Sequence, residues 1–382
     1  MNEMVSLLSD LVRIDSVNPW LVPGGAGEGE IGDYIAHWLE PLGLEVKLDE
    51  VEEGRSNLIA HLPGTGGGRS LCLYAHLDTV GYANWEDRAL VPQVEGDRLY
   101  GLGAVDDKGH CAVAMLVLKS LVECGVRLRG DLIVALLADE EGTSSGTMHF
   151  VKHYNPDAAI IMDSPSGPLK VIVTHQGFGW FDIVAKGKAA HGCEPEIGVD
   201  AIAHMAEVIV RLQQLNRGKF ALSPHPLNGK VVFHTGTIAG GTDYATYPDW
   251  CKVGLEIGFQ PGETVDDYIA EIEDVLQEVK STYPNFSGDV RLNLARPPFE
   301  AQRHQELWKV LSEEIEYLYG QPPEAVGLNT WADTALFQEA GVPSLMIGAT
   351  GANLHSPDEW VSLTDLAKLK EIIEATVKRY CA

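Results

Sequence analysis

The chain has 382 residues, of which 45% are hydrophobic and 22% charged. This length exceeds what one hydrophobic core usually organises, so we expect two domains, and the composition excludes a disordered protein. The net charge of −27 repels phosphate backbones and anionic membrane surfaces, which argues against nucleic acid or a membrane as partner.

The first part of the sequence alternates predicted helices and strands. Amphipathic spacing and apolar runs predict, in chain order, helices over 2–15 and 29–41, strands near 44–49, 57–62, 70–75 and 98–101, a helix over 108–124, a strand over 131–138, a helix near 146–154 and a strand over 158–162. This alternation predicts a mixed α/β sheet covered by helices on both faces. Ligand sites in such folds lie beyond the carboxyl ends of the strands.

From about residue 177 the pattern changes. The predicted elements become strand 178–184, helix 198–215, strands 230–237 and 251–259, helix 264–281 with Thr264 as its cap, and strand 288–294. This is the element order of a ferredoxin-like α+β sandwich. After Arg296, a helix over 302–319, a strand over 344–347 and a helix from 364 return to the first sheet. We therefore expect one domain over 1–176 and 296–382, with 177–295 inserted as a second.

Acidic residues or histidine stand at the ends of three predicted strands. His76 ends one strand, Glu140 and Glu141 follow another, and Asp163 follows the third. Residues two apart on an extended chain point the same way, so Asp78 can accept a hydrogen bond from the far nitrogen of a metal-bound His76. An isolated acidic turn is ordinary surface decoration, but this repetition at strand ends indicates a shared site.

Asp106 is the candidate for a carboxylate that bridges two divalent metal ions, because its glycine-flanked turn lets the backbone approach a site closely. His76 and Asp163 would complete one metal site, and Glu141 and His355 the other.

Glu140 is the candidate general base. It cannot share a ligand direction with its neighbour Glu141, so it stays free to act on water. Two divalent ions would also neutralise the four carboxylates of this cluster, which are Asp106, Glu140, Glu141 and Asp163. Imidazole and carboxylate ligands suit zinc, and cobalt and manganese accept similar sets.

Five motifs in order resemble a known family. They are His76-Leu-Asp78, Gly103-Ala-Val-Asp106-Asp-Lys-Gly109, Asp139-Glu140-Glu141-Gly142, Asp163-Ser-Pro165 and His355-Ser-Pro-Asp-Glu359. They look like the motifs of the co-catalytic zinc hydrolases that include acetylornithine deacetylase, succinyl-diaminopimelate desuccinylase, aminoacylase and glutamate carboxypeptidase. The stretch Leu99-Tyr-Gly-Leu-Gly103 looks most like the acetylornithine deacetylase branch.

The resemblance implies a zinc-peptidase-like fold whose inserted domain serves as lid and dimerisation domain. It implies zinc ligands at His76, Asp106, Glu141, Asp163 and His355, with Glu140 and Asp78 in catalytic roles. It also implies a cis peptide bond after Asp106. His191, in Ala189-Ala-His191-Gly, resembles the family's histidine that reaches the active site of a partner subunit and polarises the scissile carbonyl, so the resemblance implies a homodimer.

The sequence departs from the family at two substrate-binding positions. The family has an asparagine where this chain has Ala245, and an arginine that holds the product carboxylate where it has Gly258. Glycine offers no substitute for a guanidinium fork, which puts α-carboxylate recognition in question. Candidate replacement contacts are His175, His234, Thr242, Asp243, Tyr244 and Trp331.

We interpret the sequence as a dinuclear metal hydrolase of amide C–N bonds, in which a metal-bound hydroxide attacks the carbonyl of an N-acyl amino acid or small peptide. One alternative is a C–N hydrolase of substrates without an α-carboxylate, such as an aromatic amide, a carbamoyl compound or an aminohydrolase substrate. Another is a non-catalytic binding protein of the same fold.

The compartment follows from the cysteines and the first residues. The six cysteines are widely spaced and form no Cys-x-x-Cys pair, so neither a disulfide framework nor a zinc knuckle is predicted. The start carries Glu3 and no basic region, which argues against a signal peptide. No run of about 18 or more apolar residues occurs, so no membrane span is predicted. We expect a cytoplasmic protein with a small-molecule amide substrate.

Overall fold

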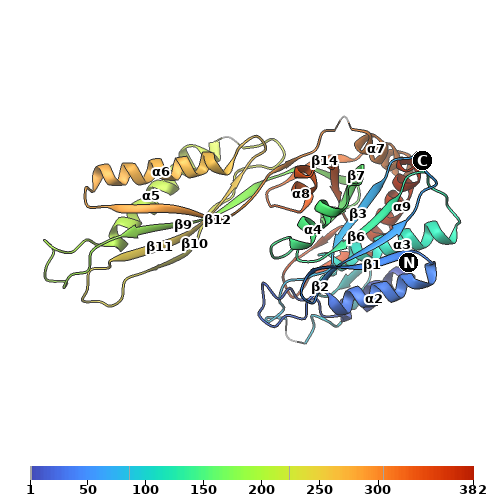
Figure 1. The fold of residues 1–382 in the computed structure, drawn as a ribbon, viewed down its shortest axis with the longest axis horizontal. Helices are drawn as coiled ribbons and strands as arrows, with labels where there is room; N and C mark the ends of the chain where they lie inside the picture. Colours follow the sequence, from blue (N-terminus) through green and yellow to red (C-terminus); the bar gives the residue numbers. More distant parts are fainter. Residues whose placement is uncertain (1, 86, 223, 304) are drawn as a thin grey trace. The chain divides into compact units, whose positions relative to one another are not determined.

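The computed structural model describes residues 2–85, 87–222, 224–303 and 305–382. The chain divides into two compact units, and the second is inserted in the sequence of the first (Figure 1). The first unit comprises Met1–Val173, Ala301–Val326 and Ala332–Ala382, and the second comprises Thr174–Glu300 and Gly327–Trp331. The short segment Gly327–Trp331 therefore belongs with the inserted unit, although it falls inside the expected range 296–382.

The first unit is built on a mixed sheet with the strand order β1-β2-β6-β3-β7-β15-β8. Its strands are β1 (Glu45–Glu52), β2 (Arg55–Leu62), β3 (Leu71–His76), β6 (Leu132–Leu137), β7 (Ala158–Met162), β8 (Lys170–His175) and β15 (Ser344–Ile347). Strand β3 runs parallel to β6 and β7, and β15 runs parallel to β7. The carboxyl ends of these four strands therefore meet at one edge of the sheet.

Helices cover both faces of this sheet. Alternate strand residues, such as Leu73 in β3 and Val134 in β6, pack into one core with the helices α1 (Asn2–Arg13), α2 (Gly29–Leu39), α3 (Lys108–Glu123), α7 (Glu306–Tyr319) and α9 (Leu363–Tyr380). On the other face, Tyr74 and Phe150 contact Phe337, which brings in α4 (Ser145–His153) and α8 (Thr334–Glu339). Both faces of the central strands are thus buried, as their continuous apolar runs predict.

A small antiparallel sheet accompanies the main one in the first unit. Its order is β16-β17-β5-β4, from β4 (Gln93–Glu95), β5 (Arg98–Tyr100), β16 (Gly351–Ala352) and β17 (Trp360–Ser362). The one-turn helix η1 (Glu40–Leu42) also belongs to this unit, and the short strand β14 (Glu324–Leu328) begins in it and ends in the segment Gly327–Trp331 of the second. The small sheet brings a segment near residue 100 beside one near residue 360.

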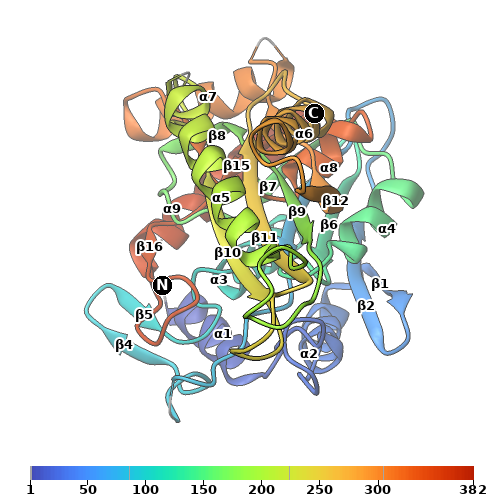
Figure 2. The same ribbon diagram turned by 90° about the vertical axis from the view of Figure 1, so that its left-hand side faces the viewer.

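The second unit is a four-stranded antiparallel sheet with two helices on one face (Figure 2). The elements run β9 (Gly177–Lys186), α5 (Ala201–Gly218), η2 (Phe220–Leu222), β10 (Phe233–Gly240), β11 (Trp250–Phe259), α6 (Val265–Thr282) and β12 (Ser287–Arg296), and the short β13 (Phe299–Glu300) pairs with the end of β8. The sheet order β10-β11-β9-β12 is that of the ferredoxin-like sandwich. Thr264 and Asp267 form a capping box at α6.

The expected fold class is confirmed, both for the mixed helix-covered sheet and for the ferredoxin-like insertion. In the small sheet, the strand expected over 98–101 is confirmed as β5, whereas β4, β16 and β17 were not predicted, because two or three residues give too little periodicity. Strand β8 was also not predicted. The helix expected from residue 302 begins at Glu306, and residue 304 lies outside the described residues. No helix in the described ranges is long and apolar enough to cross a membrane.

Candidate metal centre and active site

The candidate residues of the first unit gather at the edge where the parallel strands end. His76 is the last residue of β3, and Glu140 and Glu141 follow β6. Asp163 directly follows β7, and His355 lies in the loop between β16 and β17. The shared strand direction therefore brings residues from distant parts of the sequence to one place.

Asp106 lies in the turn between β5 and α3, and this turn is held by a buried carboxylate. Glu359 accepts hydrogen bonds from the backbone N–H groups of Gly103 at 3.2 Å, Val105 at 3.0 Å and Asp106 at 3.2 Å. Gly103 has φ +74, a conformation that favours glycine. The peptide bond between Asp106 and Asp107 is cis, which confirms the expectation from the resemblance.

The two oxygens of Asp106 face two different histidines. His76 Nε2 lies 3.0 Å from Asp106 Oδ1, while His355 Nε2 lies 3.2 Å from Asp106 Oδ2. His355 Nε2 is also 3.1 Å from Glu141 Oε1. Asp106 is therefore within reach of both histidines, which is the geometry that a bridging carboxylate needs.

Two groups of side chains can each hold a metal ion, and Asp106 belongs to both. In each group the potential ligand atoms lie within 4.8 Å of one another; the groups are His76, Asp106 and Asp163, and Asp106, Glu141 and His355. Imidazole nitrogen and carboxylate oxygen are ligands that zinc and related divalent ions accept. The donor chemistry thus fits a pair of divalent metal ions.

The electrostatics of this cluster favour positive charge. Hydrogen bonding to Asp106 and Glu141 raises the pKa of His355 to about 10, although the side chain is half exposed. Burial, and then the charge of Asp106, raises the pKa of Glu141. Burial, followed by neighbouring aspartates, also raises the pKa of Asp163 well above its ordinary value. Crowded, buried carboxylates of this kind are stabilised by cations.

The support of His76 differs from the expectation. Its Nδ1 lies 3.0 Å from the backbone carbonyl oxygen of Asp78 and 3.5 Å from the Asp78 carboxylate, so the carbonyl is the nearer acceptor. The carboxylate accepts the N–H groups of Glu140 and Glu141, both at 3.1 Å. The reason is that β3 ends at His76, so Asp78 lies beyond the regular strand and turns toward the chain that follows β6.

A buried polar network behind this turn was not predicted. Asn18 Nδ2 donates to Asp78 at 2.7 Å and to Asp139 at 2.9 Å. Arg55 donates to the same Asp139 oxygen at 2.9 Å and, through Nε, to Glu28 at 2.9 Å. Asp139 itself has φ +69. The network therefore fixes the unusual backbone from which the next two residues project.

A second unpredicted pair supports the metal-facing end of β3. Asp107 accepts the backbone N–H of His76 at 2.8 Å and contacts His110 Nδ1. His110 Nε2 accepts the N–H of Ala349 at 3.0 Å, at the end of β15. Burial lowers the pKa of His110 to about 4, so the ring is neutral and its tautomer is fixed by these two partners.

The remaining candidates lie in the second unit. His191 is exposed, and its Nδ1 is 3.0 Å from Cys193 Sγ. Thr242 and Tyr244 are exposed in the loop after β10. Trp331 is partly buried, and its Nε1 donates to the Pro297 carbonyl at 3.0 Å. Within their own unit these side chains form no common cluster comparable to that around Asp106.

The structure gives a packing reason for the glycine at position 258. A Cβ atom there would lie 2.3 Å from Gln176 Oε1, a buried oxygen that accepts the N–H of Val232 at 3.1 Å. A side chain at this position would therefore have to displace the Gln176 amide. Ala245 is held by its backbone alone, since its carbonyl accepts from Gly192 at 2.7 Å.

Comparisons with known proteins agree with this arrangement. The model of Peptidase family M20/M25/M40 matches residues 72–379. An acetylornithine deacetylase of Proteus mirabilis is 30% identical over 393 residues, which cover 99% of this chain and 96% of that protein.

Two solved structures show the same fold over the whole chain. A tripeptidase of Staphylococcus aureus has a TM-score of 0.84 at 21% identity, covering 100% of this chain and 98% of that one. A dinuclear metal binding peptidase of Bacillus subtilis has a TM-score of 0.78 at 17% identity, with the same coverage of 100% and 98%. At such identities the likeness concerns the fold.

Proposed function

The chain belongs to Peptidase family M20/M25/M40, and from this premise we propose that it is a dinuclear metal-dependent hydrolase of amide C–N bonds in N-acyl amino acids or small peptides. The observation that carries the proposal is the position of Asp106, whose two carboxylate oxygens face His76 at 3.0 Å and His355 at 3.2 Å. A single carboxylate shared between two donor groups is the arrangement that a co-catalytic metal pair requires.

In the proposed centre, His76, Asp106 and Asp163 would hold one ion, and Asp106, Glu141 and His355 the other. Zinc suits these nitrogen and oxygen ligands, and cobalt or manganese could take its place. When bound, two such ions supply Lewis acidity that polarises a carbonyl and lowers the pKa of water.

Glu140 is the proposed general base and acid. Burial, followed by the charge of Asp163, raises its pKa well above the ordinary value, which is the direction that suits a carboxyl group that exchanges protons. It accepts the proton of the attacking water and delivers it to the leaving nitrogen. Asp78 acts as a positioning residue, because it holds the N–H groups of Glu140 and Glu141.

His191 is proposed to stabilise the oxyanion in the active site of a partner subunit. Its exposure leaves it available to another chain. The second unit is the proposed dimerisation and lid domain: β10 is an edge strand, and Ile238 on it is 59% exposed. An open edge strand with exposed apolar residues is suited to association with a second copy.

The default substrate is an N-acyl amino acid, as the name of the Proteus mirabilis relative suggests. The second candidate is a substrate without an α-carboxylate, and Gly258 favours it, because glycine offers no guanidinium and the Gln176 amide occupies the space beside it. Thr242, Tyr244 and Trp331 are the proposed replacement contacts. The proposed compartment is the cytoplasm, which is consistent with six free cysteines.

The test is a hydrolysis panel of N-acyl amino acids and their carboxamide analogues, with metal content measured by elemental analysis. We expect hydrolysis that Glu140→Gln abolishes while metal is retained. A strong preference for the free carboxylates would support the default substrate, and indifference would support the second candidate. If wild type and Glu140→Gln are equally inert on the whole panel while metal is bound, the chain is a binding protein and the proposal is wrong.

A further inference from the structure

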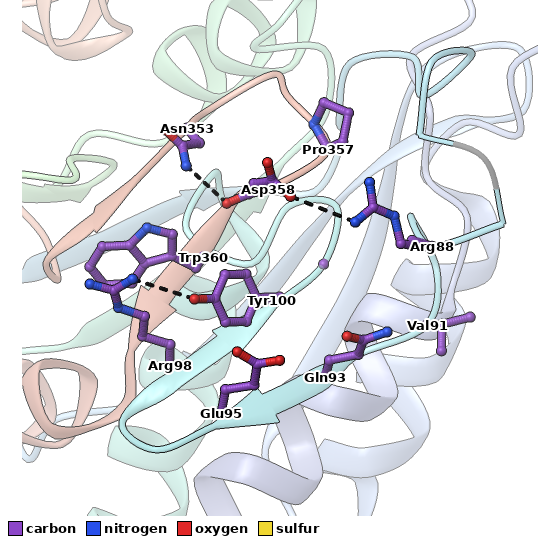
Figure 3. A pocket seen from close by; sticks show the side chains of 11 residues that line it. Arg88, Val91, Gln93, Glu95, Arg98, Tyr100, Asn353, Pro357, Asp358 and Trp360 are labelled. Carbon is purple, nitrogen blue, oxygen red and sulfur yellow. Dashed lines mark hydrogen bonds and ion pairs between the residues drawn. The ribbon is translucent and has the colours of Figure 1, made fainter.

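A cavity of about 330 Å³ opens on the small sheet of the first unit, beside the loop that carries His355 (Figure 3). Its volume is at the lower end of the range of about 300 to 1,000 Å³ that small-molecule sites have. The hairpin of β4 and β5 forms one wall, and Asn353, Pro357 and Asp358 of the His355 loop form another. None of the proposed metal ligands lines it.

The cavity contains four charged side chains whose charges sum to zero: Arg88, Arg98, Glu95 and Asp358. Arg88 and Asp358 form an exposed ion pair at 3.7 Å. Arg98 has no carboxylate partner among the described residues; its guanidinium lies 4.0 Å from the ring centre of Trp360 and contacts the Tyr100 hydroxyl at 3.4 Å. The carboxylate of Glu95 likewise has no ion-pair partner among the residues that the structure describes.

Arg98 and Glu95 are directly opposite each other in the hairpin of β4 and β5. Side chains at opposite positions start only about 5 Å apart, yet Figure 3 shows the guanidinium of Arg98 turned onto Trp360 and away from Glu95. Apart from the Arg88–Asp358 pair, the cavity thus holds one cation and one anion at opposite positions of the hairpin, neither of which has an ion-pair partner among the described residues. Apolar surface lies beside Arg98 on Trp360, while Val91 and Pro357 line other parts of the cavity.

From this geometry we infer that the cavity is a binding site for a free α-amino acid with an apolar side chain. The ligand's carboxylate would bind Arg98, whose planar fork suits carboxylates. Its ammonium group would bind Glu95, and its side chain would pack on the rings of Tyr100 and Trp360. A zwitterion fits better than an anion, because the cavity is neutral and the net charge of −27 repels anions.

The site adjoins two segments of the candidate metal centre. Asn353 Nδ2 donates to the carbonyl of Asp358 at 3.2 Å, closing the loop that carries His355. Gly101, which lines the cavity, donates its N–H to the carbonyl of Glu359 at 3.2 Å, and the carboxylate of Glu359 holds the Asp106 turn. The cavity therefore borders both segments. Because binding is measured without turnover, the inference stands apart from the proposed hydrolysis.

The experiment is titration of the full-length protein with L-leucine, followed by tryptophan fluorescence. The signal of the site is the part of the change that Trp360→Phe removes, which separates it from leucine bound elsewhere. We expect saturable binding that Arg98→Gln and Glu95→Gln each weaken about tenfold or more, since each removes one charge-assisted contact. The matched controls Arg127→Gln and Glu53→Gln, at exposed positions outside the cavity, should bind like wild type.

Two analogues test the class of ligand. L-leucinol lacks the carboxylate and 4-methylpentanoate lacks the ammonium group, so both should bind about tenfold more weakly or worse. If 4-methylpentanoate binds like leucine the site is an anion site, and if leucinol does it is a cation site; either result overturns the inference. It is equally overturned if Trp360→Phe leaves the signal unchanged or if Arg98→Gln binds like wild type.

Discussion

The sheet edge of the first unit and the exposed loops of the second differ in how they hold their candidate residues. At the sheet edge, Asp106 and its partners are fixed by buried backbone and side-chain hydrogen bonds. In the second unit, His191, Thr242 and Tyr244 are exposed, and the side-chain hydrogen bonds of His191 and Thr242 reach residues only one or two positions away. The hydrogen bonds of the first region hold its side chains in the positions that bond cleavage needs. The exposed residues of the second region can be substituted with fewer consequences for the fold.

The departures from the family pattern follow this division. All five candidate metal ligands and Glu140 are present, whereas both altered positions, Ala245 and Gly258, lie in the second unit. In the function proposed above, chemistry and recognition are assigned to separate units, an arrangement that would let them diverge independently. Substitutions at three positions would break or sharpen this contrast, and a fourth tests a position outside both regions.

The largest effect is expected from Glu140→Gln. The substitution removes the proton acceptor but keeps the shape, so kcat should fall about a thousandfold or more with little change in metal content. Steady-state kinetics and elemental analysis check this, with Glu53→Gln as an exposed control. A kcat within tenfold of wild type would remove Glu140 from the reaction.

The next effect is expected from Arg55, which fixes Asp139 in the turn before Glu140. Arg55→Gln should lower kcat about ten- to a hundredfold and weaken metal binding, because supporting hydrogen bonds orient the groups around a metal. Arg55→Lys keeps the charge and should recover part of the loss. If both variants change stability alone, with kcat and metal affinity unaltered in the folded protein, the network has no positioning role.

In the second unit, the substitution Gly258→Arg tests whether a single arginine restores recognition of a substrate carboxylate. The new side chain would meet Gln176 Oε1, so we expect a loss of about 1 to 3 kcal/mol in unfolding free energy and no gain in preference for carboxylate substrates. Gly258→Arg combined with Gln176→Ala should recover part of the stability. A strong new preference in the single variant would contradict this account of the site.

The smallest effect is expected outside both regions, at Glu374 in α9. Burial alone would raise its pKa, but hydrogen bonds from Lys370 at 2.6 Å and Lys378 at 2.5 Å lower it to about 2. A carboxyl group whose pKa is lowered in the folded state stabilises the fold at pH values above its ordinary pKa of 4.5. This contribution is lost as the pH falls toward 2.

Glu374→Gln should therefore cost about 1 kcal/mol near pH 7, after allowance for solvent screening, and the difference should shrink as pH falls below about 5. Urea unfolding at several pH values measures it. A difference that stays constant with pH would exclude the ion pairs as its source. Activity per folded molecule should not change.

Much of the sheet edge was predictable because its strands are continuous apolar runs in the sequence. The apolar runs that end at His76, at Asp139 and at Asp163 mark three parallel strands, and parallel strands place their ends together. The cis bond after Asp106 followed from the family resemblance. These features depend on local sequence or on a motif.

The supporting network was not predictable in the same way. Arg55 lies 84 positions before Asp139 in the sequence, and Asn18 lies 121 positions before Asp139. No local spacing therefore relates either residue to Asp139. The same holds for His110, which joins β3 to β15 through Asp107. The choice of Asp78's partners also depended on where β3 ends, which a sequence pattern defines only to within a few residues.

The most direct test of the account is the metal stoichiometry of Asp106→Asn. Wild type should bind two divalent ions per chain, measured by elemental analysis after dialysis against a low, fixed zinc concentration. Asp106→Asn should lose both sites because the shared carboxylate belongs to each. The control Asp266→Asn, at an exposed position of the second unit, should keep both ions. Two ions retained by Asp106→Asn with wild-type affinity would contradict the central claim that one carboxylate joins the two halves of the site.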